Sequence, residues 1–307
     1  MAAARVVVLG SANMDLVVRL PRTPAVGETV FGSGFATAPG GKGLNQAVAA
    51  RRAGAEVAFA GALGRDDHGA ALAELLDREG IDTSAVRRVD APTGVALISV
   101  LDSGDNSIVV CTGANAELRE LDAQTRDLIA GASYLVMQFE LDPGLLLEAA
   151  RFARVHGVRT VLTPAPVIEH DPELVELTDL LVLNAGEAAQ LSGVGDPELA
   201  AAELSRQAGA VVATLGGDGS VLARDGRVVE RIPARAVAAV DTTAAGDTYV
   251  GVLTARIGSG DDLPAAMRWA TAAASITVTR PGASGSMPFA AEIERVLGPS
   301  TGPPPPR

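Results

Sequence analysis

Short, apolar, β-branched segments alternate with longer alanine-rich segments along most of this chain. The short segments predict strands at residues 6–9, 57–60, 134–137, 160–162, 180–183, 211–214 and 220–223. The longer segments predict helices at residues 43–53, 69–79, 143–156, 197–208, 246–257 and 264–279. Asp142-Pro143 and Asp196-Pro197 each place an N-cap before a first-turn proline. Strands that alternate with helices form right-handed crossover units, so we expect an α/β fold with helices on both faces of a mainly parallel sheet.

Two segments, 14–38 and 93–112, depart from this rhythm. Apolar and polar residues alternate over 16–20 and 29–35, with Pro21, Pro24 and Gly27 between them. Residues 93–112 contain two β-branched runs joined by the turn Asp102-Ser-Gly-Asp-Asn106, which is a hairpin pattern. We expect a small β-sheet that projects from the main domain; edge hairpins without a functional role are the alternative.

Composition excludes several classes of protein. The chain has 37 acidic and 25 basic residues, a net charge of -12 and 3% aromatic residues, so we expect no nucleic-acid partner. A single cysteine, Cys111, rules out a disulfide framework, and the three histidines lack metal-ligand spacing. Without a run of about 18 uncharged apolar residues, we expect no membrane contact and a cytoplasmic location.

The C-terminal end differs from the rest of the chain. Residues 299–307 contain five prolines among nine residues and can form neither a helix nor a central strand. We therefore expect one domain over residues 1–298, which is long enough for a packed core, followed by a disordered proline-rich tail at 299–307.

The segment Asp241-Thr-Thr-Ala-Ala-Gly-Asp-Thr-Tyr-Val-Gly251 follows a predicted strand at 236–240 and opens a predicted helix. Its small residues let backbone N–H groups face a common point, namely those of Ala244, Ala245, Gly246 and Asp247. Uncovered N–H groups at a helix start bind anions. The helix dipole keeps Asp247 ionised, which makes it a weak base suited to orienting a nucleophile in phosphoryl transfer. The alternative is an ordinary helix cap.

Three other segments could contact a ligand. Pro39-Gly-Gly-Lys-Gly-Leu-Asn-Gln46 opens a helix, and its Lys42 and Asn45 are hydrogen-bond donors; a plain loop before a helix is the alternative. Asn13 and Asp15 follow the first strand, at the end of a sheet where α/β proteins bind ligands. Thr214-Leu-Gly-Gly-Asp-Gly219 lies between two strands and reads as a hairpin turn. Neither a Gly-x-x-x-x-Gly-Lys-Ser/Thr loop nor a Gly-x-Ser-x-Gly elbow is present.

Taken together and in this order, these segments resemble the ribokinase family of carbohydrate kinases, over residues 5 to 297. The two family signatures correspond to Gly40-Gly-Lys-Gly-Leu-Asn-Gln-Ala47 and Asp241-Thr-Thr-Ala-Ala-Gly-Asp-Thr248. Further agreement comes from Gly10-Ser-x-Asn-x-Asp15, Pro24-x-x-Gly-Glu-Thr29, Thr93-Gly-Val-Ala-Leu97, Gly113-Ala-Asn115, Met137-Gln-x-Glu140 and Thr214-Leu-Gly-Gly217. The resemblance implies a ribokinase-like three-layer α/β/α sandwich with an inserted β-sheet lid over about 14–38 and 93–112. It also implies ATP-dependent phosphorylation of a sugar's primary hydroxyl, foremost that of D-ribose to D-ribose 5-phosphate.

The resemblance also implies roles for individual residues. The sugar hydroxyls would contact Asn13, Asp15, Gly41, Lys42, Gly43, Asn45 and Glu140. Asp247 would orient and deprotonate the primary hydroxyl, while the N–H groups of residues 244–247 would hold charge that develops on the γ-phosphoryl group. The nucleotide would contact Asn184, Thr214, Leu215, Gly216, Gly217, Asp218, Gly219, Gly246 and Thr271. Magnesium would be held through water by Glu187, and potassium by Asp241, Thr243, Thr277, Arg280, Gly282 and Ser286, largely through carbonyl oxygens.

The lid of this family also implies a homodimer. Three positions depart from the family pattern: Leu183 precedes Asn184 where proline is frequent, Thr163 replaces an asparagine, and Thr271 stands where a histidine often contacts adenine. These changes bear on nucleotide packing rather than on phosphoryl transfer.

Two other functions stay open, a kinase for another sugar or a nucleoside and a catalytically silent sugar-binding regulator. A nucleoside would need an aromatic platform near the lid, and only Phe31, Phe35 and Phe59 precede Tyr134.

Overall fold

One large sheet forms the body of the protein in the computed structural model, which describes residues 4–103 and 105–298. Its nine strands within those residues run in the order β13-β12-β11-β10-β9-β8-β1-β4-β5. Their bounds are β1 Arg5–Leu9, β4 Glu56–Gly64, β5 Val86–Val89, β8 Tyr134–Gln138, β9 Arg159–Thr163, β10 Leu180–Asn184, β11 Val211–Thr214, β12 Ser220–Arg224 and β13 Arg227–Ile232. From β11 to β5 all neighbours are parallel, and β12 and β13 add an antiparallel edge. The mainly parallel sheet is confirmed.

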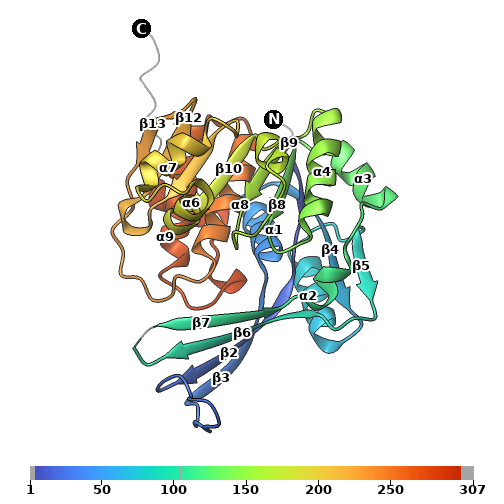
Figure 1. The fold of residues 1–307 in the computed structure, drawn as a ribbon, viewed down its shortest axis with the longest axis vertical. Coiled ribbons are helices and arrows are strands. Elements are labelled where there is room, and N and C mark those ends of the chain that lie inside the picture. The colour runs from blue at the N-terminus through green and yellow to red at the C-terminus, as the bar shows by residue number, and fades with distance from the viewer. Residues whose placement is uncertain (1–3, 104, 299–307) are drawn as a thin grey trace.

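Helices cover both faces of this sheet (Figure 1). One face packs against α1 Lys42–Arg52, α2 Asp67–Arg78, α8 Ala245–Gly258, α9 Leu263–Thr277 and α10 Ala290–Leu297. The other packs against α3 Ala123–Ala130, α4 Pro143–Val155, α5 Glu173–Glu176, α6 Ala185–Ser192 and α7 Pro197–Leu204. Strand β1 shows why its sequence is a continuous apolar run: Val6 and Val8 enter one core, and Val7 and Leu9 enter the other. The expected three-layer sandwich is therefore confirmed.

A second sheet projects from the body (Figure 1). It consists of β3 Gly34–Gly40, β2 Asn13–Leu20, β6 Gly94–Leu101 and β7 Asn106–Cys111, in that order. Only residues 10–12 separate β1 in the body from β2 in this small sheet. The inserted sheet is confirmed, but the expected strand at 29–35 is wrong, because β3 begins at Gly34 and pairs with β2 through Gly40. Alternation over 29–35 misled because those side chains stay largely exposed and bury no common face.

A strand expected at 236–240 is also absent. Residues 233–239 have no regular structure, and the amides of Val240 and Asp241 donate to the carbonyl of Val278 at the end of α9. The β-branched residues there remain exposed, with Val240 68% and Val237 45% accessible, so no neighbouring strand is available to pair with them.

The helix starts follow their capping signals. Asp142 accepts from the amide of Leu145, and Asp196 accepts from those of Glu198 and Leu199. Four helices were not expected: the four-residue α5 and the eight-residue α3, α6 and α10. Such short segments carry weak periodicity. The predicted tail at 299–307 lies outside the described residues. No helix in the described part of the chain combines the length and apolar character needed to cross a bilayer.

Candidate active site

A cavity of about 650 Å³ lies where the body meets the small sheet. Its polar lining includes Ser11, Asn13, Asn115 and Glu140. Its apolar lining includes Val110, Phe139, Leu141, Pro166 and Ile168. Asn13 is fixed by Asn115, whose Nδ2 donates to Asn13 Oδ1 at 2.8 Å and whose Oδ1 accepts from the amide of Ala12 at 3.1 Å. The rim is therefore made of oriented donors and acceptors, as a polyhydroxylated ligand requires.

The glycine loop before α1 forms one wall of this site. Gly41 has φ +91°, and a Cβ there would lie 2.8 Å from the amide nitrogen of Asn13 and 2.9 Å from Ala12 Cα. Glycine at this position therefore lets the loop pack directly on the start of β2. The Lys42 amide then donates to Glu140 Oε2 at 3.0 Å, and Ser11 Oγ donates to the same oxygen. Residues from three distant segments thus meet at one carboxylate.

Three carboxylates and one ammonium group converge here. Burial, together with the charges of Glu140 and Asp247, raises the pKa of Asp15 to about 7. Burial lowers the pKa of Lys42, but the carboxylates of Asp247, Glu140 and Glu187 outweigh burial and hold it above its usual range. The predicted sugar residues Asn13, Asp15, Lys42 and Glu140 are therefore brought together with Asp247.

Asp247 is the third residue of α8 and only 8% of it is exposed. Its Oδ2 accepts from Asn45 Nδ2 and its Oδ1 from Gln46 Nε2, both at 3.0 Å. Burial raises the pKa of Asp247, while Lys42, Gln46 and Asn45 oppose that rise. The helix dipole, which can be predicted from the sequence, favours a charged Asp247. Burial, which only the structure shows, acts in the opposite direction because it raises the pKa of this carboxyl.

The start of α8 presents free amides beside this carboxylate. Ala244 is its N-cap and adopts a left-handed conformation with φ 58°, a strained state for a residue with a Cβ. The Ala245 amide donates to Thr242 O at 3.3 Å, while those of Ala244, Gly246 and Asp247 have no acceptor among the described residues. Three of the four predicted amides thus remain available to an anion.

A second cavity of about 390 Å³ is lined in part by Ala245 and Gly246 at the start of α8. It contains the predicted nucleotide residues Thr214, Gly216, Gly217, Gly219, Gly246 and Thr271. Leu215 and Asp218 belong to the same turn without lining the cavity, and Asn184 does not line it either. The turn is indeed a connection between antiparallel strands, as its pattern suggested. The Thr271 hydroxyl is buried with no hydrogen-bond partner among the described residues, so it can accept or donate to a ligand here.

The second cavity also contains residues that the sequence did not indicate. They are Tyr249, Ser275, Val278 and the irregular segment with Arg235, Ala236, Val237 and Ala239. Tyr249 directly follows the C-terminal signature, and its hydroxyl is 2.9 Å from Ser220 Oγ. The α8 start thus lines the second cavity through Ala245 and Gly246, whereas Asp247 lines neither cavity and instead contacts Asn45 and Gln46 of α1.

Asn184 and Glu187 form a capping box at the start of α6. Asn184 Oδ1 accepts from the Glu187 amide at 2.9 Å, and Glu187 Oε2 accepts from the Asn184 amide at 2.8 Å. This contact occupies one carboxylate oxygen of Glu187 and leaves Oε1 open. Among residues 4–103 and 105–298, no group of three or more His, Cys, Asp or Glu side chains could enclose a metal. Such a donor set fits Mg²⁺ carried by phosphates and water, which needs only one or two carboxylates.

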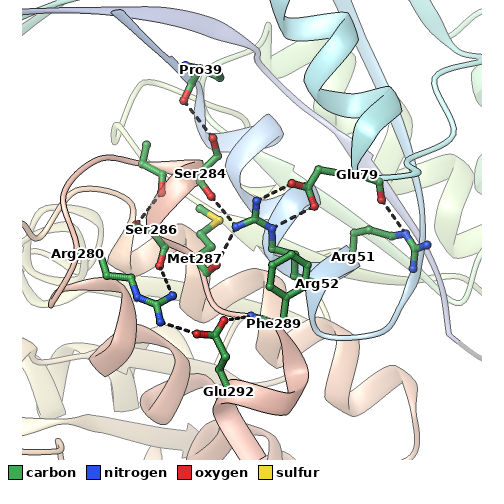
Figure 2. Close-up of polar contacts among 11 residues, drawn as sticks. Pro39, Arg51, Arg52, Glu79, Arg280, Ser284, Ser286, Met287, Phe289 and Glu292 are labelled. Carbon is green, nitrogen blue, oxygen red and sulfur yellow. Dashed lines mark hydrogen bonds and ion pairs between the residues drawn. The ribbon is translucent and has the colours of Figure 1, made fainter. Parts of the chain in front are cut away.

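Most of the residues expected around potassium lie on two adjoining loops. Asp241 joins the loops because Oδ1 accepts from the Thr243 amide and Oδ2 from the Gly282 amide, each at 2.9 Å. Arg280 pairs with Glu292 at 2.5 Å and donates to Ser286 O at 3.4 Å (Figure 2). The Thr277 hydroxyl instead lies 3.1 Å from that of Thr248. The loops offer the carbonyl oxygens that K⁺ prefers, although that of Ser286 already accepts from Arg280.

Arg52 fastens the second loop to the body (Figure 2). Its guanidinium pairs with Glu79 at 2.5 Å, donates to Ser284 O at 2.9 Å and Met287 O at 2.8 Å, and lies 4.8 Å from the ring centroid of Phe289. Both charged side chains are nearly buried, at 11% and 13% exposed. From the sequence alone, an arginine in the last turn of a helix suggests only a favourable contact with the helix dipole. The contact of Arg52 with this loop could therefore not be predicted.

Other site residues were also missed. Ser11, Gln46, Asn115 and Gln138 lie inside the quoted motifs, but their residue types alone did not distinguish them from structural neighbours. Their partners come from segments about 90 to 200 positions away, and only the fold brings these together.

Comparisons with known proteins agree with this geometry. A family model described as "pfkB family carbohydrate kinase" matches residues 3–290. The ribokinase of Haemophilus influenzae is 40% identical over 298 residues, covering 94% of this chain and 97% of the relative. The ribokinase of Bacillus subtilis is 37% identical, covering 94% and 98%.

Solved structures give the same result. A structure of Arabidopsis thaliana ribokinase complexed with ribose and ATP superposes with a TM-score of 0.90 at 31% identity, covering 98% of this chain and all of that one. Ribokinase from Thermotoga maritima gives a TM-score of 0.88 at 32% identity, covering 96% and 99%.

Proposed function

We propose that this chain, which belongs to the pfkB family of carbohydrate kinases, transfers the γ-phosphoryl group of ATP to the primary hydroxyl of D-ribose. The product is D-ribose 5-phosphate. The observation that carries the proposal is Asp247: a buried carboxylate held by Asn45 and Gln46 at a helix start whose free amides adjoin the second cavity. The solved ribokinase complex with ribose and ATP supports this choice of substrates.

The first cavity would hold the sugar. Asp15 and Glu140 would accept hydrogen bonds from sugar hydroxyls. Amide or ammonium groups would come from Asn13, Lys42 and Asn45, and the backbone amides of Gly41 and Gly43 would complete the wall. Fixed donors and acceptors on several sides select a hydroxyl pattern, because a wrongly placed hydroxyl leaves a buried partner unpaired.

The second cavity would hold the adenine nucleotide. Its phosphates would point toward Gly246 and the free amides of Ala244 and Asp247, which carry the charge that develops on the transferred group. Asp247 would orient the sugar hydroxyl and accept its proton as the bond to phosphorus forms and the bond to the β-phosphate oxygen breaks. In a loose transition state this late proton transfer suits a weak base.

Two ions are part of the proposal. Mg²⁺ would come with ATP, with Glu187 contacting its water shell, and when bound it neutralises phosphate charge. A monovalent cation, K⁺, would lie at the loops joined by Asp241 and would fix them beside the anion site. Replacing sodium with potassium in the assay should then raise activity, and equal rates in both salts would exclude this cation role.

The small sheet would act as a lid and as a dimer contact. Leu97, Ile108, Val109 and Val110 are 44–60% exposed on β6 and β7, so an apolar surface is available to a second copy. We also propose a cytoplasmic location, since ATP is the phosphoryl donor.

A substrate panel tests the proposal most directly. Ribose, deoxyribose, fructose and adenosine would be compared in a coupled assay with ATP, Mg²⁺ and K⁺. Ribose should give the highest kcat/KM, and Asp247→Asn should lower turnover at least about 10²-fold, the usual scale for a positioned base. Wild-type turnover in that variant would remove Asp247 from the mechanism, and ribose binding without turnover would favour a silent regulator.

One observation keeps the nucleoside alternative in the panel. Of the aromatic residues considered from sequence, Phe59 is buried in the core and Phe31 and Phe35 are exposed. Phe139, which the sequence did not indicate as a ligand contact, lines the first cavity next to Glu140. A preference for adenosine would assign Phe139 as the platform for its base.

A further inference from the structure

Gln46 contacts the candidate base directly and, like that base, does not line the 650 Å³ cavity. It is completely buried on α1, and every polar atom of its amide is engaged. Nε2 donates to Asp247 Oδ1 at 3.0 Å and lies 3.5 Å from Thr163 Oγ1, while Oε1 accepts from Gln138 Nε2 at 2.8 Å. A glutamine amide so enclosed has one orientation that pairs each donor with an acceptor.

The strand ends explain this enclosure. Gln138 and Thr163 are the last residues of β8 and β9 and are register partners, so both side chains reach Gln46 from the same edge of the sheet. Rotating the Gln46 amide by half a turn would direct its oxygen at the Asp247 carboxylate and its NH₂ at that of Gln138. With Gln138 oriented as observed, both contacts would be repulsive. Gln138 Oε1 is buried without a partner among the described residues, so the Asp247 carboxylate is the neighbour that most strongly fixes the Gln46 donor. Thr163, which departs from the family pattern, thereby gains a role as acceptor for the second N–H.

We propose that Gln46 is a positioning residue that holds the Asp247 carboxylate charged and fixed in direction, and that Gln138 orients Gln46 for this purpose. The proposal rests on the proposed phosphoryl transfer. Asn45 binds the other carboxylate oxygen but also belongs to the sugar site, whereas Gln46 acts only through Asp247. Each carboxylate oxygen keeps one lone pair free, so the sugar hydroxyl can approach while the two amides prevent rotation of the carboxylate.

The electrostatic surroundings make this support necessary. The charged groups that face Asp247 are Lys42 from α1, Glu140 after β8 and Asp15 from β2. The contact from α9 to this part of α8 is neutral, between the hydroxyls of Thr277 and Thr248. Two of these charges are carboxylates that favour protonation of Asp247, as does its burial. Hydrogen bonds to the charged form oppose protonation, and Gln46 donates one of the two.

The test is the pH dependence of kcat at saturating ribose and MgATP, because kcat reports groups in the substrate complex and bound ribose holds Asp15 charged. Gln46→Met, a neutral replacement of similar size, should move the acid limb upward by about one to two pH units. Activity should recover in part at high pH. Gln138→Met should shift the limb in the same direction by less, and Gln46→Glu by more, because it places a like charge beside Asp247.

Gln124→Met is the matched control, since Gln124 is an exposed glutamine on α3, and its profile should coincide with that of the wild type. The Kd for ribose should change less than threefold in the Gln46 and Gln138 variants. An unshifted acid limb with a lower kcat at every pH would overturn the proposal. If Gln46→Met does not fold, the Gln138→Met profile decides alone. A wild-type protein inactive on every sugar would instead refute the proposed function.

Discussion

Replacing Gly251 with alanine should separate the two helices that meet at the candidate base. Gly251 lies on α8 one turn after Asp247 and packs against α1. A Cβ there would lie 2.5 Å from Gln46 O, 2.6 Å from Ala49 Cβ and 2.8 Å from the Ala50 amide nitrogen. Two of these three atoms are backbone, so rotation of a side chain cannot relieve the contact.

The magnitude follows from these distances. Restoring ordinary contacts requires the helices to move apart by roughly 1 Å, and overpacking of this kind costs about 1–3 kcal/mol. Alanine regains about 1 kcal/mol in helix propensity, which leaves a net loss of roughly 1 kcal/mol in unfolding free energy. The larger effect is functional: the 3.0 Å contacts from Asn45 and Gln46 to Asp247 would lengthen beyond hydrogen-bond range. Misplacement by about 1 Å can lower turnover about 10²-fold.

Thermal unfolding and steady-state kinetics of Gly251→Ala measure both effects. Gly144→Ala is the matched control, because Gly144 is exposed in the first turn of α4 and meets only the Asp142 side chain at 3.0 Å. The control should match wild-type kcat and equal or exceed its Tm. Wild-type kcat in Gly251→Ala, with Tm also unchanged, would refute the argument that close packing of α1 and α8 delivers the amides to Asp247.

Three further perturbations test other parts of the structure. Burial and the charges of Glu140 and Asp247 raise the pKa of Asp15 to about 7, so if Asp15 binds the sugar as proposed, its carboxylate would accept hydrogen bonds from sugar hydroxyls well only above that pH. The Kd for ribose should fall about tenfold from pH 6 to pH 8 by calorimetry, and a flat profile would contradict this. Arg52→Met leaves the Glu79 carboxylate nearly buried without its partner and should cost about 3 kcal/mol in urea denaturation; a loss below about 1 kcal/mol would mean that the pair is well solvated. The double variant Ile108→Asp, Val109→Asp should convert a dimer to a monomer in sedimentation experiments while leaving the fold intact, and a wild-type protein that sediments as a monomer would exclude the lid contact.

The fold was predictable from the sequence where one pattern dominated. Strand β1 is a continuous apolar run because both of its faces are buried, and the Asp-Pro pairs before α4 and α7 mark their starts. At residues 29–33 and 236–240 the same kind of pattern gave no strand. Pairing needs a neighbouring strand and a buried face, and neither property is local to the segment.

The candidate site divides in a similar way. Asp247, Lys42 and Glu140 were expected because they occupy motif positions, and the structure brings them together. Gln46 and Gln138 were not expected because a glutamine acquires a role only through its contacts, and their contacts span 92 and 201 positions in sequence. The pKa directions were equally unpredictable, since burial at Asp15 and Asp247 arises from the packing of several elements rather than from adjacent residues.

The short link between β1 and β2 has a thermodynamic consequence. Residues 10–12 join the large sheet to the small one, and Ser11, Asn13 and Asp15 lie in this link or directly after it. Any rotation of the small sheet relative to the body would therefore carry these side chains with it. If they bind the sugar as proposed and the small sheet closes as a lid, sugar affinity and the equilibrium between open and closed forms become a single coupled quantity, because a ligand shifts a conformational equilibrium by its difference in affinity for the two states. A substitution at Asn13 or Asp15 that alters sugar affinity would then also alter the population of the closed form.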